Sequence, residues 1–334
     1  MGRTHAEAIR HLDSAATLVA VWGGSRAPGL AEQCGIACES GMEALVRRPD
    51  IDAIVVATPH HLHAAEAQLA LELGKHVMVE KPITTAVEDC DRLIELADRR
   101  RAVLAVVYQQ RFRVNNARAA ELIRAGTIGR VLTVQVSMPL FKGALQSGSF
   151  GGRWEWWDDP ASVGHVINSA PHAIDLIRWV TGAEVENVSA FCRTFSAGHR
   201  VEDTTLALME FSNGTLFSLF SSNAFPQAPF PNEDFRFRIM GTTGLIDLDP
   251  YGELRVETGR GWEVASRQPA VGYESANTAF SPARMQAYWD QMQAFIDAIH
   301  GQPLRCGSGR DGRAGIATCL AMLRSSRERR WVRP

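Results

Sequence analysis

The sequence predicts a parallel α/β sheet domain followed by a mostly antiparallel α+β domain. Three nearly continuous apolar runs, 51–58, 76–79 and 103–107, alternate with stretches of helical periodicity. That order is typical of buried parallel strands joined by helices. From Val185 onward the pattern becomes rich in short strands, and Asn213-Gly214 is a strong hairpin signal. These observations indicate two domains, which we expect to span residues 1–112 and 113–334.

Composition narrows the class of protein. The chain has 334 residues, 46% hydrophobic and 22% charged, with a net charge of −2, so we expect no nucleic-acid partner and no membrane partner. No apolar run is long enough to span a bilayer, and no signal peptide opens the chain. The six cysteines form no CxxC pair or finger spacing, which favours free thiols in a reducing cytoplasm.

The first domain is organised around the stretch 77–83, where an apolar run ends in Glu80, Lys81 and Pro82. A helix-like stretch, 62–73, precedes it, ends at Gly74 and has three apolar residues in i, i+4 register: Ala65, Leu69 and Leu73. A second helical pattern follows, with Thr84 or Thr85 as its cap. The corner therefore lies at the carboxyl end of a buried strand, where open α/β sheets bind ligands. A solvated Glu-Lys pair in a turn is the alternative.

The remaining elements follow from periodicity and caps. A buried strand is expected at 17–22, a helix at 114–125 stopped by Gly126, and a strand at 131–136. A helix within 165–182 places His172 in its first turn. Further strands are predicted at 204–211, 215–221, 235–240, 244–249 and 253–257, which suggests an antiparallel sheet covered on one face, and helices at 285–299 and 312–326.

Two motifs far apart resemble the Gfo/Idh/MocA family of NAD(P)-dependent oxidoreductases, which act mostly on sugars, inositols and related polyols. The run Val-Glu-Lys-Pro-Ile at 79–83 is similar to the family's Glu-Lys-Pro signature. The run 164–182 is similar to its D-x-G-x-H-x-x-D-x-x-x-x-x-x-G pattern, with His172, Asp175 and Gly182 in place. The resemblance covers nearly the whole chain. It implies a Rossmann-type first domain, an open antiparallel sheet in the second, and a homodimer or homotetramer.

The beginning of the chain departs from the family pattern G-x-G-x-x-G-x-x-H. Gly2 and His5 match only its tail, and a helix starts there with no strand in front. Either the chain is recorded from an internal Met, or the protein lacks the loop. We favour the truncated start, because everything downstream still has the pattern of a dinucleotide-binding unit. As the sequence stands, impaired cofactor affinity and a strand missing from the centre of the sheet are expected.

The resemblance and the strand ends together imply a cofactor site. After the strand 17–22 no acid follows; Ser25 and Arg26 stand there and suit a 2′-phosphate, which favours NADP over NAD. The alternative makes Ser25 a helix cap and Arg26 a solvated side chain. Three histidines, at 60, 61 and 63, invite a metal interpretation, but they sit at a strand-to-helix corner and no Cys or carboxylate is nearby to complete a site, so we expect no metal. The expected cofactor residues are Gly2, Ser25, Arg26, Thr58, Pro59, His60, His63, Glu80, Lys81 and Gln109.

The catalytic residues implied by the resemblance are Lys81, His172 and Asn168. Asn168 stands where the family commonly has a catalytic Asp, and Asn cannot carry charge or accept a proton. We therefore assign the role of general base to His172, because the unperturbed pKa of a histidine side chain is near neutrality. Arg111 and Trp156 join Asn168 and His172 as expected substrate residues. Trp156 lies in a Gly-, Ser- and Trp-rich stretch that suits either a sugar face or interface packing.

Three functions are compatible with these residues. The first is a dehydrogenase in which Lys81 holds the reacting oxygen and His172 exchanges the hydroxyl proton. The second is a non-catalytic sensor of sugar or cofactor on the same scaffold, which Asn168 and the missing loop favour. The third is the family's NAD-dependent glycosidase chemistry, which no feature singles out. We favour the dehydrogenase, because Lys81 and His172 are both present.

Overall fold

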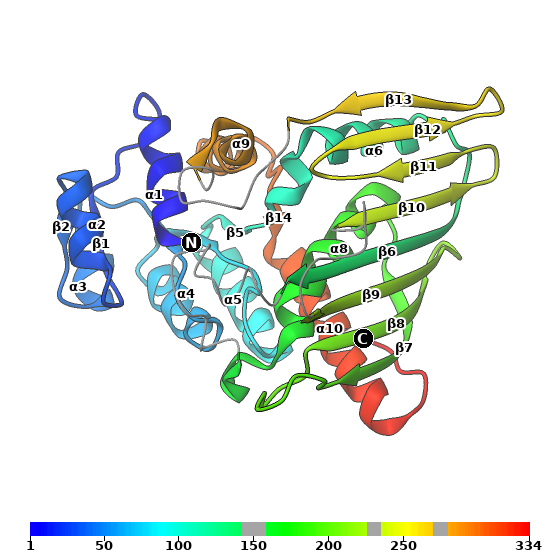
Figure 1. Ribbon diagram of the computed structural model, residues 1–334. Helices are drawn as coiled ribbons and strands as arrows, with labels where there is room; N and C mark the ends of the chain where they lie inside the picture. The colour runs from blue at the N-terminus through cyan, green and yellow to red at the C-terminus, as the bar shows by residue number, and fades with distance from the viewer. Residues whose placement is uncertain (142–157, 226–234, 270–279) are drawn as a thin grey trace. The chain divides into compact units, whose positions relative to one another are not determined.

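The structure is a computed structural model that describes residues 1–141, 158–225, 235–269 and 280–334. Its contacts divide the chain into two compact units, which we treat separately (Figure 1). The first unit consists of 1–109 with 287–313, and the second of 110–286 with 314–334. The predicted domain boundary near residue 112 stays a prediction.

A parallel sheet forms the centre of the first unit. Strands β3 (Ala53–Val56), β4 (His76–Val79) and β5 (Leu104–Val106) pair in parallel, and β14 (Gly307–Ser308) adds an antiparallel edge to β5. The short strands β1 (Ala20–Val21) and β2 (Ala37–Cys38) pair with each other in a separate sheet. The predicted Rossmann-type parallel sheet is confirmed, although β3 and β5 are shorter than the apolar runs that predicted them.

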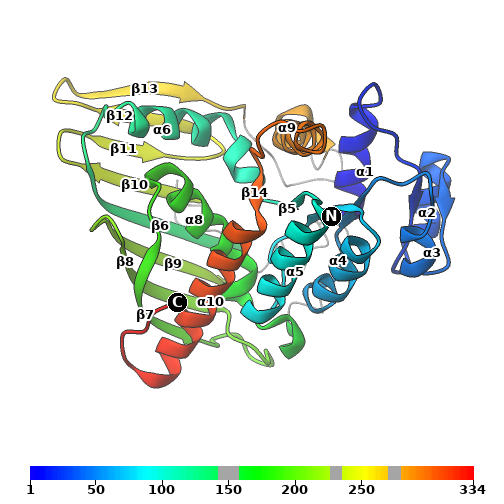
Figure 2. The ribbon, with the colours of Figure 1, turned by 180° about the vertical axis from the view of Figure 1, so that it is seen from behind.

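Helices cover both faces of this sheet. α4 (His63–Glu72) and α5 (Val87–Arg100) pack together on one face, and α1 (Gly2–His11) lies with the 287–299 part of α9 (Pro282–Ile299) on the other (Figures 1 and 2). Two short helices, α2 (Ala27–Cys34) and α3 (Met42–Val46), accompany β1 and β2, and neither was predicted with bounds.

The helix predicted at 62–73 is confirmed as α4, whereas the cap predicted for α5 was wrong. The buried face of α4 consists of His63, Glu66, Ala67, Ala70 and Leu71, whereas Ala65 and Leu73 are exposed. A mostly small and apolar helix offers several possible faces, and tertiary packing chose another one. The residue that precedes α5 is Ala86, and no side chain caps the helix there. Thr84 instead donates a hydrogen bond from its hydroxyl to the Ala86 carbonyl.

The second unit is built on one large sheet of eight strands, which confirms the predicted second fold. Only β6 and β9 pair in parallel, and every other neighbouring pair in this sheet is antiparallel. The outermost strands, β7 and β13, were not assigned from the sequence. In spatial order the strands are β13 (Trp262–Arg267), β12 (Glu253–Glu257), β11 (Leu245–Leu248), β10 (Arg236–Gly241), β6 (Val131–Phe141), β9 (Leu216–Phe225), β8 (Thr204–Phe211) and β7 (Val185–Arg193).

One face of this sheet is covered by helices. α6 (Val114–Arg124), α8 (His165–Thr181) and the 314–328 part of α10 (Gly309–Glu328) lie over it (Figures 1 and 2). Burial alternates along β8, so that Ala207, Met209 and Phe211 point into the core while Leu206 and Leu208 are exposed. The period of two therefore separates a packed face from an open one, as the sequence predicted.

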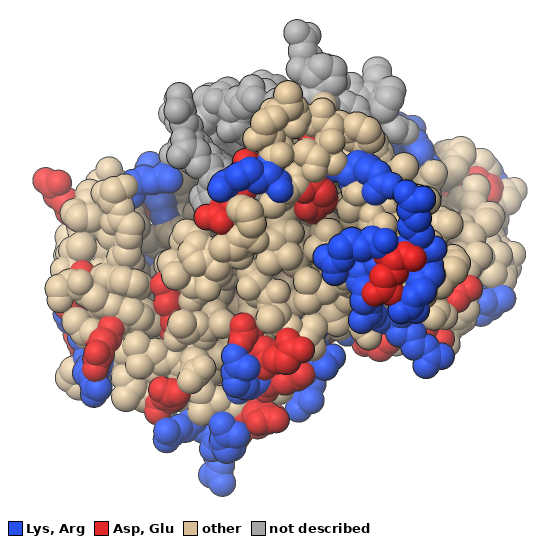
Figure 3. Space-filling view, turned by 90° about the horizontal axis from the view of Figure 1, so that it is seen from below, with Lys and Arg blue, Asp and Glu red and all other residues tan. Residues whose placement is uncertain are grey.

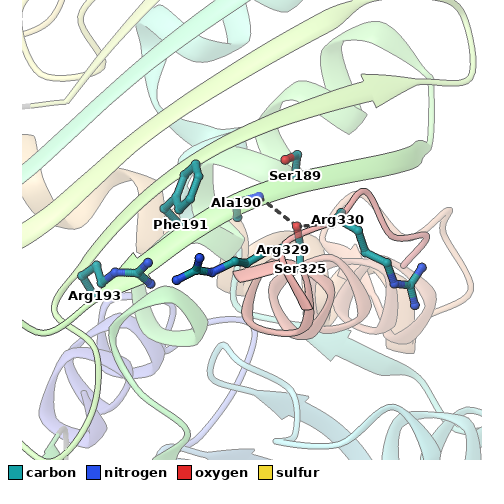
Figure 4. A pocket seen from close by; sticks show the side chains of 7 residues that line it. All are labelled: Ser189, Ala190, Phe191, Arg193, Ser325, Arg329 and Arg330. Carbon is teal, nitrogen blue, oxygen red and sulfur yellow. Dashed lines mark hydrogen bonds between the residues drawn. The ribbon is translucent and has the colours of Figure 1, made fainter. Parts of the chain in front are cut away.

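The edge of the sheet at β7 is protected by the end of the chain. The Ser325 hydroxyl accepts a hydrogen bond from Ala190 N at 3.0 Å (Figure 4), and the Ser326 hydroxyl accepts one from Cys192 N at 2.8 Å. Val332 forms an antiparallel bridge with Val188. Since an unpaired strand edge invites pairing with other chains, these contacts block such pairing along β7.

Charged side chains of both signs are interspersed on the face of the molecule drawn in Figure 3. Exposed side chains in both units also form short-range pairs, such as Arg47 with Glu43 and Arg118 with Glu121. Among the residues that the structure describes, no helix combines the length and the apolar character needed to cross a bilayer.

Candidate active site

The Glu-Lys-Pro corner begins where β4 ends. Val77, Met78 and Val79 have no exposed surface, and Glu80 N continues the ladder by donating to Val56 O at 2.8 Å. Lys81 follows half-buried, and the Lys81–Pro82 peptide bond is cis. Ile83 is again fully buried. Two buried anchors therefore flank Lys81 at the carboxyl edge of the parallel sheet, where the sequence predicted it.

A buried pair joins this corner to α1. His5 Nε2 lies 2.8 Å from Glu80 Oε1, and because a carboxylate only accepts, the ring nitrogen donates. Glu80 Oε2 accepts from Lys81 N at 3.2 Å. Burial raises the pKa of Glu80, but the hydrogen bond from His5 and nearby positive charges outweigh it and lower the pKa to about 2. Glu80 is therefore ionised at neutral pH inside the unit.

The loop after β3 contains the predicted residues 58–63. The Thr58 hydroxyl donates to Glu66 Oε2 at 2.6 Å, and burial raises the pKa of Glu66. His63 is fully buried between two backbone carbonyls, with Nδ1 at 2.7 Å from Pro82 O and Nε2 at 2.8 Å from Thr58 O. The ring of His60 lies edge-on to that of His63, 5.7 Å away. The loop and the lysine corner are thus tied by one imidazole.

A carboxylate does lie near these histidines, contrary to the sequence argument, because α4 brings Glu66 back to the loop. Over the described ranges, however, no group of three or more His, Cys, Asp or Glu side chains is arranged to hold a metal ion.

The other predicted cofactor residues of the first unit differ in exposure. Ser25 and Arg26 are both exposed in the turn after β1. Arg26, not Ser25, is the residue that precedes α2, so the alternative of a Ser25 cap is wrong. Gly2 is exposed in the first turn of α1, which carries no acid. Gln109 is 9% exposed, and its Oε1 accepts no hydrogen bond from any residue that the structure describes.

α8 carries the predicted residues of the second unit. Asn168 is 4% exposed and His172 is half-buried. The prediction that His172 lies in the first turn was wrong, because the helix begins at His165 and continues through Pro171. Lys81 and His172 belong to different units, so their encounter across a nicotinamide ring stays a prediction.

Arg111, predicted to meet substrate, is engaged inside the second unit. Its Nε donates to Asp175 Oδ2 at 2.8 Å and its Nη2 to Asp175 Oδ1 at 2.5 Å. The two side chains are only 8% and 1% exposed, and the guanidinium also lies 5.9 Å from the centre of the Trp179 ring. This bidentate pair fixes the turn after β5 to α8, which carries Asn168 and His172. Sequence reasoning had not connected the two residues.

Glu202 occupies the start of α8 and was not singled out from the sequence. Its Oε1 accepts from Val166 N at 2.6 Å, and its backbone carbonyl accepts from His165 N at 3.3 Å. Gly164 precedes the helix with φ +109°, and a Cβ there would overlap the Glu202 carboxylate. One remote residue thus satisfies two donors that helix starts otherwise leave open, one with its side chain and one with its backbone carbonyl.

A pocket in the described part of the second unit does not coincide with the predicted site. It has a volume of about 370 Å³ and lies beside β7 and the end of α10, where its lining includes Phe191, Arg193 and Arg329 (Figure 4). No predicted site residue lines it. Trp156, the remaining predicted substrate residue, falls outside the residues that the structure describes.

Comparison with known protein families shows the family to which this chain belongs. Residues 1–108 match the model of an oxidoreductase family with an NAD-binding Rossmann fold, and residues 116–247 match the GFO/IDH/MocA C-terminal domain. The chain belongs to the GFO/IDH/MocA family. It is accordingly an oxidoreductase with a dinucleotide-binding first half, as the two sequence motifs predicted.

Several named proteins are moderately similar to this chain. A 1-carboxy-3-chloro-3,4-dihydroxycyclo hexa-1,5-diene dehydrogenase of Comamonas testosteroni is 35% identical over 178 residues, which cover 53% of this chain but only 44% of that enzyme. Inositol 2-dehydrogenase 1 of Saccharopolyspora erythraea is 28% identical over 98% of this chain and 91% of its own length. The crystal structure of GenD2 from gentamicin A biosynthesis, in complex with NAD, has a TM-score of 0.82 at 25% identity, covering all of this chain and 93% of that one.

The carboxylate at the start of α8 makes a testable contribution to stability. Burial raises the pKa of Glu202 from 4.5 to about 7. Between these values the folded protein binds more protons than the unfolded chain, so stability is present at low pH and is lost as pH rises toward 7. This difference in pKa corresponds to a loss of roughly 3 kcal/mol at most in the free energy of unfolding.

Glu202→Gln keeps an oxygen for Val166 N but has no charge to bury. We expect the variant to gain stability relative to the parent protein as pH rises from about 5 to 8. Urea unfolding at several pH values measures this difference. The exposed Glu210→Gln on β8 is the control and should show no such trend. A constant difference between Glu202→Gln and parent across this range contradicts the assignment.

Proposed function

We propose that this oxidoreductase transfers a hydride between a nicotinamide cofactor and a hydroxyl or carbonyl group of a sugar, inositol or related polyol. The observation that carries the proposal is Lys81, half-buried at the carboxyl end of β4 and flanked by buried anchors. The inositol dehydrogenase that aligns along nearly the whole chain supports the substrate class.

The first unit offers groups that fit a dinucleotide. α1 has no acid in its first turn, so its N-terminal N–H groups suit a pyrophosphate. Gln109 Oε1 is a buried acceptor that no described residue satisfies, and the carboxamide of a nicotinamide is a donor of the right kind. Exposed Ser25 and Arg26 suit a 2′-phosphate.

When bound, the nicotinamide accepts or donates a hydride, which is a proton together with two electrons. This chain supplies the rest. In oxidation, Lys81 binds the reacting oxygen and stabilises the negative charge that develops on it as the hydroxyl proton leaves, before hydride transfer converts the alkoxide into a carbonyl. His172 accepts the hydroxyl proton and returns it in reduction. Asn168, which cannot exchange protons, orients the substrate by hydrogen bonds.

Replacement of Lys81 tests the catalytic assignment. We expect Lys81→Met to lower kcat by about a hundredfold or more, because the side chain keeps its length but loses the charge that faces the oxygen. Steady-state kinetics on a panel of polyols measures it, with the exposed Arg92→Ala on α5 as control. Unchanged kcat removes Lys81 from the chemistry. Tight NADPH binding by the parent protein with no turnover on any polyol favours a sensor instead.

The preference for NADP over NAD follows from Arg26. Loss of a guanidinium that grips a 2′-phosphate typically costs about 1.5–3 kcal/mol. We therefore expect Arg26→Ala to raise the Kd for NADPH at least tenfold and to leave that for NADH within about twofold. Fluorescence titration with both cofactors measures the split, and exposed Arg47→Ala is the control. Equal weakening of both cofactors contradicts a 2′-phosphate contact.

The open face of the eight-stranded sheet supports a homo-oligomer. Phe191, Leu206, Leu208 and Leu216 are each more than half exposed, and Phe191 pairs in register with Leu206. A patch of this kind on a sheet is typical of a subunit contact. We expect light scattering to give a dimer or tetramer, and the double variant Leu206→Asp, Leu208→Asp to give smaller particles. A monomeric parent protein contradicts the proposal. The six free thiols agree with the cytoplasm as its location.

A further inference from the structure

Glu80 and His63 use their polar atoms inside the first unit. Glu80 is 5% exposed and binds His5 with one oxygen and Lys81 N with the other. His63 has no exposed surface, and both of its ring nitrogens lie against backbone carbonyls. Neither residue therefore has an obvious atom left to offer a cofactor, although the family resemblance implied that both bind one.

The backbone contacts of His63 and its burial have opposite effects on the protonation of its ring. A carbonyl oxygen only accepts, so a ring flanked by two carbonyls satisfies both contacts only when both nitrogens carry protons. Burial outweighs the two carbonyls and the charge of Glu80, so the pKa of His63 is lowered, which favours the neutral ring with one donating nitrogen. Its ionisable or charged surroundings are Glu80, Lys81 and the neighbouring ring of His60. His63 thus links Thr58 O, in the loop after β3, to Pro82 O in the lysine corner.

The contacts of Glu80 reach two helices. Its partner His5 lies on α1 and is 3% exposed, and the His5 ring stands edge-on to that of Tyr288, 6.1 Å away on α9. The Glu80 carboxylate therefore joins the strand end, the first helix and α9 within one buried cluster. An ionised group this deep keeps its place, because moving away from its donors leaves a buried charge unpaired.

We propose that Glu80 and His63 are positioning residues that hold Lys81 from its two sides and touch neither cofactor nor substrate, while His5 holds Glu80. This inference rests on the proposed role of Lys81. Glu80 fixes the peptide N–H of Lys81, and His63 fixes the carbonyl of the next residue. The backbone on both sides of the lysine is thereby fixed.

The Glu80 carboxylate also affects the protonation of the Lys81 amine. The positive charge of Lys81 lowers the pKa of Glu80, and the interaction is mutual, so the carboxylate favours the protonated amine. The corner therefore supplies the lysine as a cation, which is the form that stabilises a developing alkoxide.

Kinetics and cofactor titration on the whole protein separate positioning from cofactor contact. For Glu80→Gln and His63→Asn we expect kcat to fall roughly tenfold to a hundredfold while the Kd for NADPH stays within about twofold. The alkaline limit of the kcat profile should move to lower pH in Glu80→Gln. Exposed Glu88→Gln and His61→Asn are matched controls and should change neither quantity. A tenfold weaker Kd with unchanged kcat overturns the inference and makes both residues cofactor contacts.

A second measurement needs no turnover, so that failure of the proposed function is told apart from failure of this inference. The acylation rate of Lys81, followed by peptide mass spectrometry at pH 7 to 9, should rise about threefold or more in Glu80→Gln, because less amine is protonated. An unchanged rate overturns the charge link whether or not the parent enzyme turns over polyols.

Variants of His5 test the same link if Glu80→Gln does not fold. His5→Gln retains a donor for Glu80 and should keep the parent acylation rate and kcat within about threefold, whereas His5→Ala should lower kcat roughly tenfold. Equal kcat in these two variants overturns the link from α1 to Lys81.

Discussion

The hydrogen bond between His5 and Glu80 is the interaction on which the first unit depends most. It places an ionised carboxylate in the interior of a parallel sheet, where an unpaired charge is strongly disfavoured. The arrangement of α1, the end of β4 and α9 around that charge is therefore constrained to keep its donors in reach. The half-buried Lys81 next to it owes its fixed backbone to the same carboxylate.

The second unit solves a similar problem with a different pair. Arg111 and Asp175 neutralise one another in a bidentate contact with almost no exposed surface, and removing either one leaves a buried charge. Glu202 adds a carboxylate at the start of the same helix. α8 is thus held at its start and in its third turn, with Asn168 and His172 between these points. In each unit, buried charged residues that take no part in the proposed chemistry hold the segment that carries the proposed catalytic residues.

Much of this fold was predictable because it depends on local patterns. Apolar runs gave the buried strands, period-two burial gave the open sheet, and Gly74 ended a helix with φ +75°, as a C′ glycine does. The start of α8 was not predictable in this way. His172 was predicted in the first turn of the helix, but the helix begins at His165 and continues through Pro171. The helix extends further because Glu202, remote in sequence, satisfies its first N–H groups.

The site shows the same limit. The lysine corner stood out from adjacent residues, but its partners His5 and His63 are separated from it along the chain by helices, and their contacts arise only when the sheet assembles. A family resemblance marks such residues without saying whether they touch a ligand or another residue. Burial and donor–acceptor pairing make that distinction here. Where every polar atom of a motif residue already has a partner inside the protein, its retention in the motif is explained by the position of its neighbour.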